Sequence, residues 1–210
     1  MEESVTDFHR RVPSKGRRHA EKDLWAQFAY IILSKPNQTI PLLVKQLGSP
    51  KAQQLHGRLD GTWHAYRVST IHRDRGKGEP RCFPGCAGKG GIADVKGGIP
   101  DVLLLLNPDY SRGKQVTADL FLYFELKSSD DRSRLTASQL NRYLAALSSE
   151  IPARGFLGAI GGPRPPIRSH SQWLGHITLT EFFELAADFV VSTSLADEIR
   201  ALQKKLQAKD

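Results

Sequence analysis

Two carboxylates and a lysine stand at the ends of two apolar segments in the middle of the chain. Asp101 directly precedes the apolar run Val102–Leu106, and the run Asp119–Lys127 ends with Glu125 and Lys127. The first run is continuously apolar, as expected of a central strand covered on both faces. In the second run successive side chains alternate between the two faces of a strand, so Glu125 and Lys127 share one face.

Pairing the two strands as an antiparallel hairpin brings the acids together. With Asn107 opposite Asp119, the count along both strands places Asp101 directly across from Glu125. Directly opposed residues have Cβ atoms about 4.5–5.5 Å apart. Two carboxylates at that separation repel each other unless they share a proton or hold a cation between them. Because a slip of one residue would separate them, the register is the expectation on which the site depends.

Paired carboxylates of this kind are hard oxygen ligands, which suit Mg²⁺ or Mn²⁺. Such an ion can polarise a phosphate, hold an attacking water and stabilise the leaving oxygen. A lysine one pleat further along the same face, Lys127, can orient that water or offset negative charge in the transition state. The three residues therefore indicate a hydrolytic metal site.

A helix follows the second strand and adds polar groups to the same region. Gln139 and Tyr143 are four residues apart and so lie on one helix face. Arginines before and within this helix, and lysines in the loop that precedes the first strand, are candidate nucleic-acid contacts: Arg132, Arg134, Arg142, Lys89 and Lys96. For the arginines, a hydrated helix surface is the alternative interpretation.

The motifs together resemble the PD-(D/E)XK nuclease superfamily. They are Pro100-Asp101, then Glu125-Leu126-Lys127, then Gln139 and Tyr143 on the following helix. The wording GIPD…ELKSS…RLTASQLNRYLAAL is especially similar to the VRR-NUC and Holliday-junction-resolvase-like branches, over about residues 97–147. The resemblance implies an α/β fold with a restriction-endonuclease-like αβββαβ core, in which helices flank a mixed central sheet.

The same resemblance implies a Mg²⁺-dependent endonuclease that hydrolyses DNA to products with a 5′-phosphate and a 3′-hydroxyl. The resemblance implies a separate role for each motif residue. Asp101, Glu125 and the Leu126 carbonyl would hold the metal, Lys127 would be the catalytic lysine, and Gln139 and Tyr143 would support the site from the helix.

Two further acids have competing interpretations. Glu21 matches the place where the superfamily often carries an additional metal ligand, and a first-turn glutamate favoured by the helix dipole explains it equally well. Asp109 belongs to a second Pro-Asp pair. In the register above it faces Thr117, too far along to meet Glu125, so we expect Asp101 to be the ligand.

The remaining pattern predicts the elements around this site. Apolar spacing and stop signals predict helices and strands in chain order. They are a helix over 19–33 ending before Pro36, a helix over 40–47 closed by Gly48, a short helix within 49–59, a strand over 62–72, a buried strand over 154–162, an edge strand over 176–179, a helix capped by Thr180, and a last helix over 195–206.

Length and charge limit the remaining possibilities. A chain of 210 residues fits a basic flexible arm over 1–18 and one domain over 19–210, with a glycine-rich loop at 73–98. The net charge of +8 and pI of about 9.6 favour a polyanionic partner such as DNA. The polar N-terminus, the lack of a membrane-spanning run and only two cysteines predict a cytoplasmic protein without a membrane partner.

Four questions stay open at this point. A nuclease fold that binds DNA without cutting it would keep the same core. Nothing in the sequence distinguishes RNA from DNA as the substrate. Cys82 and Cys86, with His64 or His72 nearby, are incomplete as a structural zinc site. A homodimer would suit an enzyme that cuts both strands, since it brings two active sites.

Overall fold

The structure is a computed structural model that describes residues 28, 31–67, 100–111, 116–127, 135–167 and 169–187. Three segments expected from the sequence lie outside the described residues. They are the basic arm over 1–18, the glycine-rich loop at 73–98 and the helix over 195–206.

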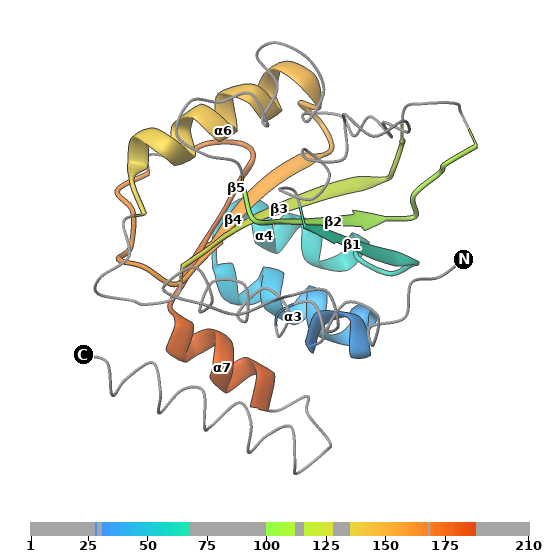
Figure 1. The fold of residues 1–210 in the computed structure, drawn as a ribbon, viewed down its shortest axis with the longest axis horizontal. Coiled ribbons are helices and arrows are strands. Elements are labelled where there is room, and N and C mark those ends of the chain that lie inside the picture. The colour runs from blue at the N-terminus through green and yellow to red at the C-terminus, as the bar shows by residue number, and fades with distance from the viewer. Residues whose placement is uncertain are drawn as a thin grey trace, which may run out of the picture.

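A five-stranded mixed sheet forms the centre of the protein (Figure 1). Its strands lie side by side in chain order: β1 Trp63–Arg67, β2 Val102–Leu106, β3 Leu120–Leu126, β4 Gly155–Ile160 and β5 Trp173–Ile177. The first three strands are antiparallel neighbours, and β3, β4 and β5 run parallel. Helix α6, Ala137–Glu150, connects β3 to β4, because parallel neighbours need a crossover. The predicted α/β class with a mixed sheet is confirmed.

Helices cover both faces of the sheet. Figure 1 shows α6 on one face, with α3 (Pro36–Leu47), α4 (Pro50–Leu55) and α7 (Leu179–Ala187) on the other. A single 3₁₀ turn, His56–Arg58, follows α4. Among the described residues, none of the helices has the length and hydropathy required to cross a bilayer.

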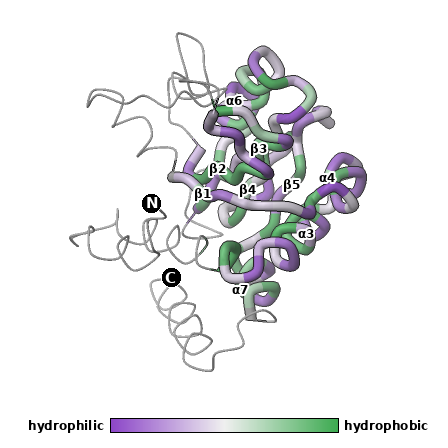
Figure 2. Tube along the Cα trace, turned by 90° about the vertical axis from the view of Figure 1, so that its right-hand side faces the viewer, coloured by the Kyte–Doolittle hydropathy of each residue, from purple (hydrophilic) through white to green (hydrophobic). Residues whose placement is uncertain are grey.

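The alternating strands divide the buried side chains into two cores. Leu122, Phe124 and Leu126 of β3 pack toward α3 and α7, whereas Phe121 and Tyr123 pack toward α6. Figure 2 shows hydrophobic segments along the central strands and hydrophilic ones on the outer turns of the helices. All seven residues of β3 are buried, including the single acid Glu125. The sheet therefore holds this acid in an apolar layer.

The first helical region is divided at Lys35. Residues 31–34 are helical, and Lys35 has φ −146° and ψ 67°. Pro36 opens α3 at a position where the backbone N–H that proline lacks would have no intrahelical partner. The expected break before Pro36 is confirmed, but α3 begins four residues earlier than the predicted Ile40. Its predicted end is confirmed, since Gly48 caps it with φ +76°.

The α3–α4 junction also covers the outer edge of β5. Gly48 forms a single antiparallel bridge with Gly175, and the Ser49 hydroxyl donates to the Trp173 carbonyl at 3.1 Å. An edge strand without such cover is a template for pairing with other chains. The predicted edge position of β5 is confirmed, although the strand begins at Trp173 rather than His176.

The start of α7 differs from the prediction by two residues. Thr178, not Thr180, accepts a hydrogen bond at Oγ1 from the Glu181 N–H at 3.1 Å. Glu181 in turn accepts from the Thr178 N–H at 2.7 Å. This reciprocal pair is a capping box, and the spacing of Thr178 and Glu181 was its sequence signal.

Candidate active site

The predicted register between β2 and β3 is confirmed. Leu106 pairs with Leu120 and Val102 pairs with Phe124, and each residue pair in between follows the same count. Beyond the far end of the hairpin, Asp109 forms a bridge with Thr117, as the count requires. The second Pro-Asp pair therefore lies at the opposite end of the two strands from Glu125.

Asp101 lies at a bend one residue before β2 begins, where the ladder ends. Its backbone N–H donates to the Phe124 carbonyl at 3.0 Å. Its carboxylate Oδ2 accepts the Leu126 N–H at 2.8 Å. The carboxylate thus takes the place of a further backbone partner and is fixed against the end of β3.

This bond also locates the Leu126 carbonyl. The N–H and C=O of one strand residue point to the same edge of the strand. Because the Leu126 N–H points to Asp101, its carbonyl lies on the same edge, between β3 and the start of β2. The backbone oxygen expected from the sequence is therefore on the Asp101 side.

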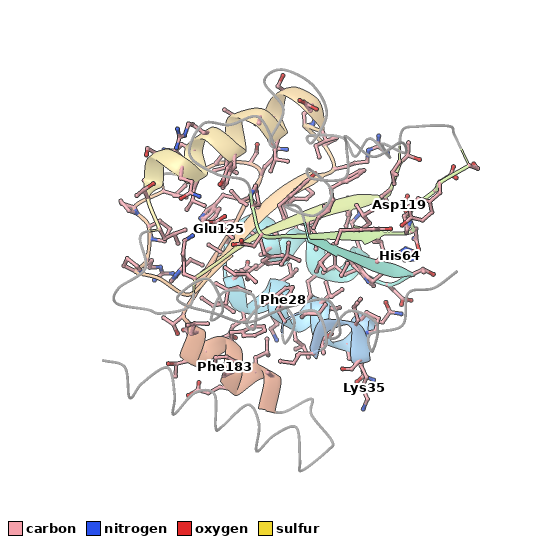
Figure 3. The ribbon with its side chains drawn as sticks, in the orientation of Figure 1. Phe28, Lys35, His64, Asp119, Glu125 and Phe183 are labelled. Atoms are coloured by element: carbon pink, nitrogen blue, oxygen red, sulfur yellow. The ribbon has the colours of Figure 1, made fainter. Side chains whose placement is uncertain are left out.

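Glu125 is the most deeply buried acid among the described residues, with 2% of its surface exposed. Figure 3 shows it on the α6 side of the sheet, at the end of β3 away from Asp119. Its Oε1 accepts from the Lys127 ammonium at 2.5 Å and from Gln139 Nε2 at 3.1 Å. Glu125 and Lys127 share a face of β3, as the strand period predicts.

The second oxygen of Glu125, Oε2, is buried and has no hydrogen-bond partner among the residues that the structure describes. Burial and the charge of Asp101 together raise the pKa of Glu125 to about 8, against the opposing effects of Lys127 and Gln139. Below about pH 8 a proton neutralises the carboxyl of the metal-free protein, but an O–H at Oε2 would find no acceptor among the described residues. An unpaired buried oxygen beside a second carboxylate suits a divalent cation.

Gln139 links Glu125 to the helix. Its Nε2 donates to Glu125 Oε1 and also to the Tyr143 hydroxyl at 2.7 Å, which uses both hydrogens of the amide. Burial and the charge of Glu125 raise the pKa of Tyr143 above its ordinary value, so the phenol stays protonated. The Thr136 hydroxyl accepts the Gln139 N–H at 3.3 Å, and this cap sets where the first turn of α6 places Gln139.

The structure therefore brings together five of the predicted site residues: Asp101, Glu125, Lys127, Gln139 and Tyr143. Arg142 is exposed on α6, next to Tyr143. The remaining predicted residues lie outside the described part of the chain. They are the additional metal ligand Glu21, the nucleic-acid contacts Lys89, Lys96, Arg132 and Arg134, and the zinc candidates Cys82 and Cys86.

Within the described ranges, no group of three or more His, Cys, Asp or Glu side chains is arranged to hold a metal ion. The candidate oxygen donors here include only two side chains, the carboxylates of Asp101 and Glu125, together with the Leu126 carbonyl. All three are oxygens, which is the donor set that Mg²⁺ prefers. These residues fit the predicted ion.

One residue near the site was not predicted. The strand pairing places Glu125 beside Ala159 and Ala159 beside His176, so the three lie in one row across the sheet. His176 is buried, and the sequence showed it only as the start of an edge strand. Its place in this row depends on a register shift between Leu157 and Gly158, which leaves no local signal in the sequence.

Comparison of the chain with protein-family models, with curated proteins and with solved structures found no match in any of the three.

Proposed function

We propose that this protein is a metal-dependent endonuclease that hydrolyses phosphodiester bonds of DNA. The observation that carries the proposal is the environment of Glu125. Its buried, unpaired Oε2 lies in a site with a second carboxylate, Asp101, and a partly buried cation, Lys127, which is paired with Oε1. Buried charge without full compensation is costly, and strongly raised pKa values of this kind cluster at functional sites.

The order of the elements supports the PD-(D/E)XK resemblance. A helix precedes three antiparallel strands, and a crossover helix leads to a strand parallel to the third. This is the αβββαβ order expected for that superfamily. The motif residues lie at the ends of the second and third strands, where the superfamily would have them.

The residues of the site have distinct tasks in this proposal. Asp101, Glu125 and the Leu126 carbonyl hold a Mg²⁺ or Mn²⁺ ion. When bound, that ion supplies Lewis-acid stabilisation of the phosphate and lowers the pKa of a water. Gln139 fixes Glu125 Oε1 by a hydrogen bond, which leaves Oε2 for the ion. The Leu126 N–H fixes the Asp101 carboxylate in the same way.

Lys127 is the proposed catalytic lysine. Its ammonium lies beside Glu125 Oε1 with 14% of its side chain exposed, at the margin of the buried site. In the reaction a water oxygen bonds to phosphorus while the bond from phosphorus to the 3′ oxygen breaks. A positive charge at this position offsets the negative charge that develops on the phosphate oxygens. The attacking water loses one proton to solvent and the departing 3′ oxygen takes one up as a hydroxyl, so the net change is one water added across the bond.

A nucleic-acid substrate is proposed because the chain carries a net charge of +8, and DNA is the one that the PD-(D/E)XK resemblance implies. Neutralising phosphates with Lys and Arg releases condensed counterions and gives sequence-independent affinity. Arg142, exposed on the helix that supports the site, is the described residue placed to add to that contact.

The test is cleavage of plasmid, single-stranded and branched DNA, and of RNA, in Mg²⁺. We expect the wild-type protein to cut DNA and Lys127→Met to cut it at least about 100-fold more slowly. Cleavage of RNA alone would assign the protein to ribonucleases. Binding of DNA without cleavage by the wild-type protein, in Mg²⁺ or Mn²⁺, would show a binding module and overturn the proposal.

A further inference from the structure

His176 makes one pair of hydrogen bonds next to the site. It is 8% exposed, and its Nε2 lies 2.9 Å from the Gly162 carbonyl and 3.2 Å from the Gly161 carbonyl. A carbonyl oxygen only accepts hydrogen bonds, so Nε2 must carry the proton and donate to both. One N–H therefore holds the two consecutive carbonyls that follow β4.

The Gly161–Gly162 turn has no conformational preference of its own. Both residues are buried and have positive φ, +75° and +77°, a region that glycine enters freely and leaves as freely. A turn of two glycines needs an outside contact to keep one conformation. In the described structure the His176 N–H holds the two carbonyls of the turn, while the Gly161 N–H donates to the Ile177 carbonyl at 2.9 Å.

Lys127 packs against this turn. Its backbone N–H donates to the Ile160 carbonyl at 2.8 Å, directly before the turn. A Cβ placed on Gly162 would lie 3.2 Å from Lys127 Cγ, and one placed on Gly161 would collide with the Lys127 carbonyl. The stem of the lysine thus packs against the bare Cα of Gly162. A shift of the turn would move the ammonium away from Glu125.

We infer that His176 is a positioning residue for Lys127, acting through the carbonyls of the Gly161–Gly162 turn. In the described structure its hydrogen bonds go to the two turn carbonyls and not to Asp101 or Glu125. The catalytic consequence rests on the proposed function, because Lys127 has a catalytic role only there. The positioning itself does not, and it can be measured without activity.

Three variants separate positioning from simple stability. His176→Phe keeps a ring of similar size and removes the donor, whereas His176→Gln keeps an N–H donor at a similar reach. Gln172→Leu is the matched control. Gln172 is 1% exposed and its Nε2 also donates to two carbonyls, those of Ile151 and Gly155, at the other end of β4. The Gln172→Leu variant therefore removes the same kind of hydrogen bond, but far from Lys127.

The first readout is single-turnover and steady-state DNA cleavage. A misplaced lysine affects the transition state rather than substrate binding, so kcat falls while KM is unchanged. We expect His176→Phe to lower kcat at least about tenfold and His176→Gln to recover most of the loss. Gln172→Leu should leave kcat within about twofold of wild type, even with a similar fall in Tm.

The second readout is lysine acetylation followed by mass spectrometry of peptides. Lys127 is 14% exposed and paired with Glu125, so wild-type protein should react slowly at this residue relative to exposed Lys45. His176→Phe should raise the Lys127 rate severalfold, and Gln172→Leu should not. If wild-type protein cuts no nucleic acid and this pattern appears, the proposed function fails and the positioning role stands.

A second pair of variants covers the case in which His176→Phe does not fold. Gly162→Ala strains a positive φ and pushes the lysine stem, whereas Gly48→Ala strains a nearly equal φ of +76° with only an ordinary contact at 3.6 Å. Gly162→Ala should raise Lys127 acetylation and lower kcat more than Gly48→Ala. Equal Lys127 acetylation in both members of each pair, or equal kcat losses in an active protein, would overturn the inference.

Discussion

The carboxylate of Asp101 accepts the Leu126 N–H at 2.8 Å, and this bond links the start of β2 to the end of β3. It fixes one acid of the site through the backbone neighbour of the other acid, Glu125. The carboxylate, the Leu126 carbonyl and the buried Glu125 side chain are thereby held by the sheet itself. A site built on strands in this way is more precise than one built on loops.

Glu125 should make the metal-free protein less stable as pH rises. Its pKa is about 8 in the folded protein against an ordinary 4.5, so between these values the folded state binds the extra proton. The free energy of unfolding then falls with pH, by at most about 1.4 kcal/mol for each pH unit. Urea unfolding in EDTA at about pH 5 and about pH 8 measures this.

Glu125→Gln is the control for that measurement, because it keeps the shape and cannot titrate. The variant should lose the part of the pH dependence that lies between about pH 4.5 and about pH 8. A variant with the same slope as wild type would show that Glu125 is ionised throughout this range in the folded state.

Mg²⁺ should stabilise the protein more at alkaline pH than at acid pH. Glu125 must lose its proton to accept the ion, so binding competes with protonation below about pH 8. An ion at about 100 times its dissociation constant adds about 2.7 kcal/mol to the free energy of unfolding. Thermal unfolding with and without Mg²⁺ at about pH 6 and about pH 9 tests this. An equal rise in Tm at both pH values would contradict it.

Gln139→Leu should weaken the site without unfolding the helix. The change removes the bonds to Glu125 Oε1 at 3.1 Å and to the Tyr143 hydroxyl at 2.7 Å. The Gln139 bond lowers the pKa of Glu125, so its loss should raise that pKa further. We expect kcat to fall about tenfold, the equivalent of one hydrogen bond. Asn141→Leu, at an exposed position of α6, is the control and should retain activity.

Gly175→Ala should destabilise the whole fold. Gly175 has φ +120°, and an added Cβ would collide with the Leu47 carbonyl, where the α3–α4 junction covers β5. We expect a loss of about 2–3 kcal/mol or more in the free energy of unfolding. Gly57→Ala is the matched control, since nothing lies within 4 Å of its added Cβ. It should change stability by less than about 1 kcal/mol.

The site could be predicted because its signals are local to two strands and one helix. The strand period places Glu125 and Lys127 on one face, and one assumed register, since confirmed, separates Asp101 from Asp109. The direction of the Asp101 carboxylate was not predictable. The register aligned Asp101 with Glu125, and it gave no sign that Oδ2 of Asp101 would accept the Leu126 N–H at the end of the ladder.

Element boundaries were missed where one residue has two roles. Pro36 was interpreted as the end of one helix, and it is also the first residue of the next. Thr178 and Thr180 both lie near the start of the apolar helix, and only the spacing of Thr178 from Glu181 selects the cap. The role of His176 depends on parallel pairing across β4, a long-range contact without a sequence period.

The most direct test compares the two Pro-Asp pairs. Asp101→Asn and Asp109→Asn are the same chemical change at opposite ends of one hairpin, and only Asp101 lies beside Glu125. We predict that Mg²⁺-dependent cleavage of DNA falls at least about 100-fold in Asp101→Asn and stays within about twofold of wild type in Asp109→Asn. Equal cleavage by the two variants would contradict the proposed active site.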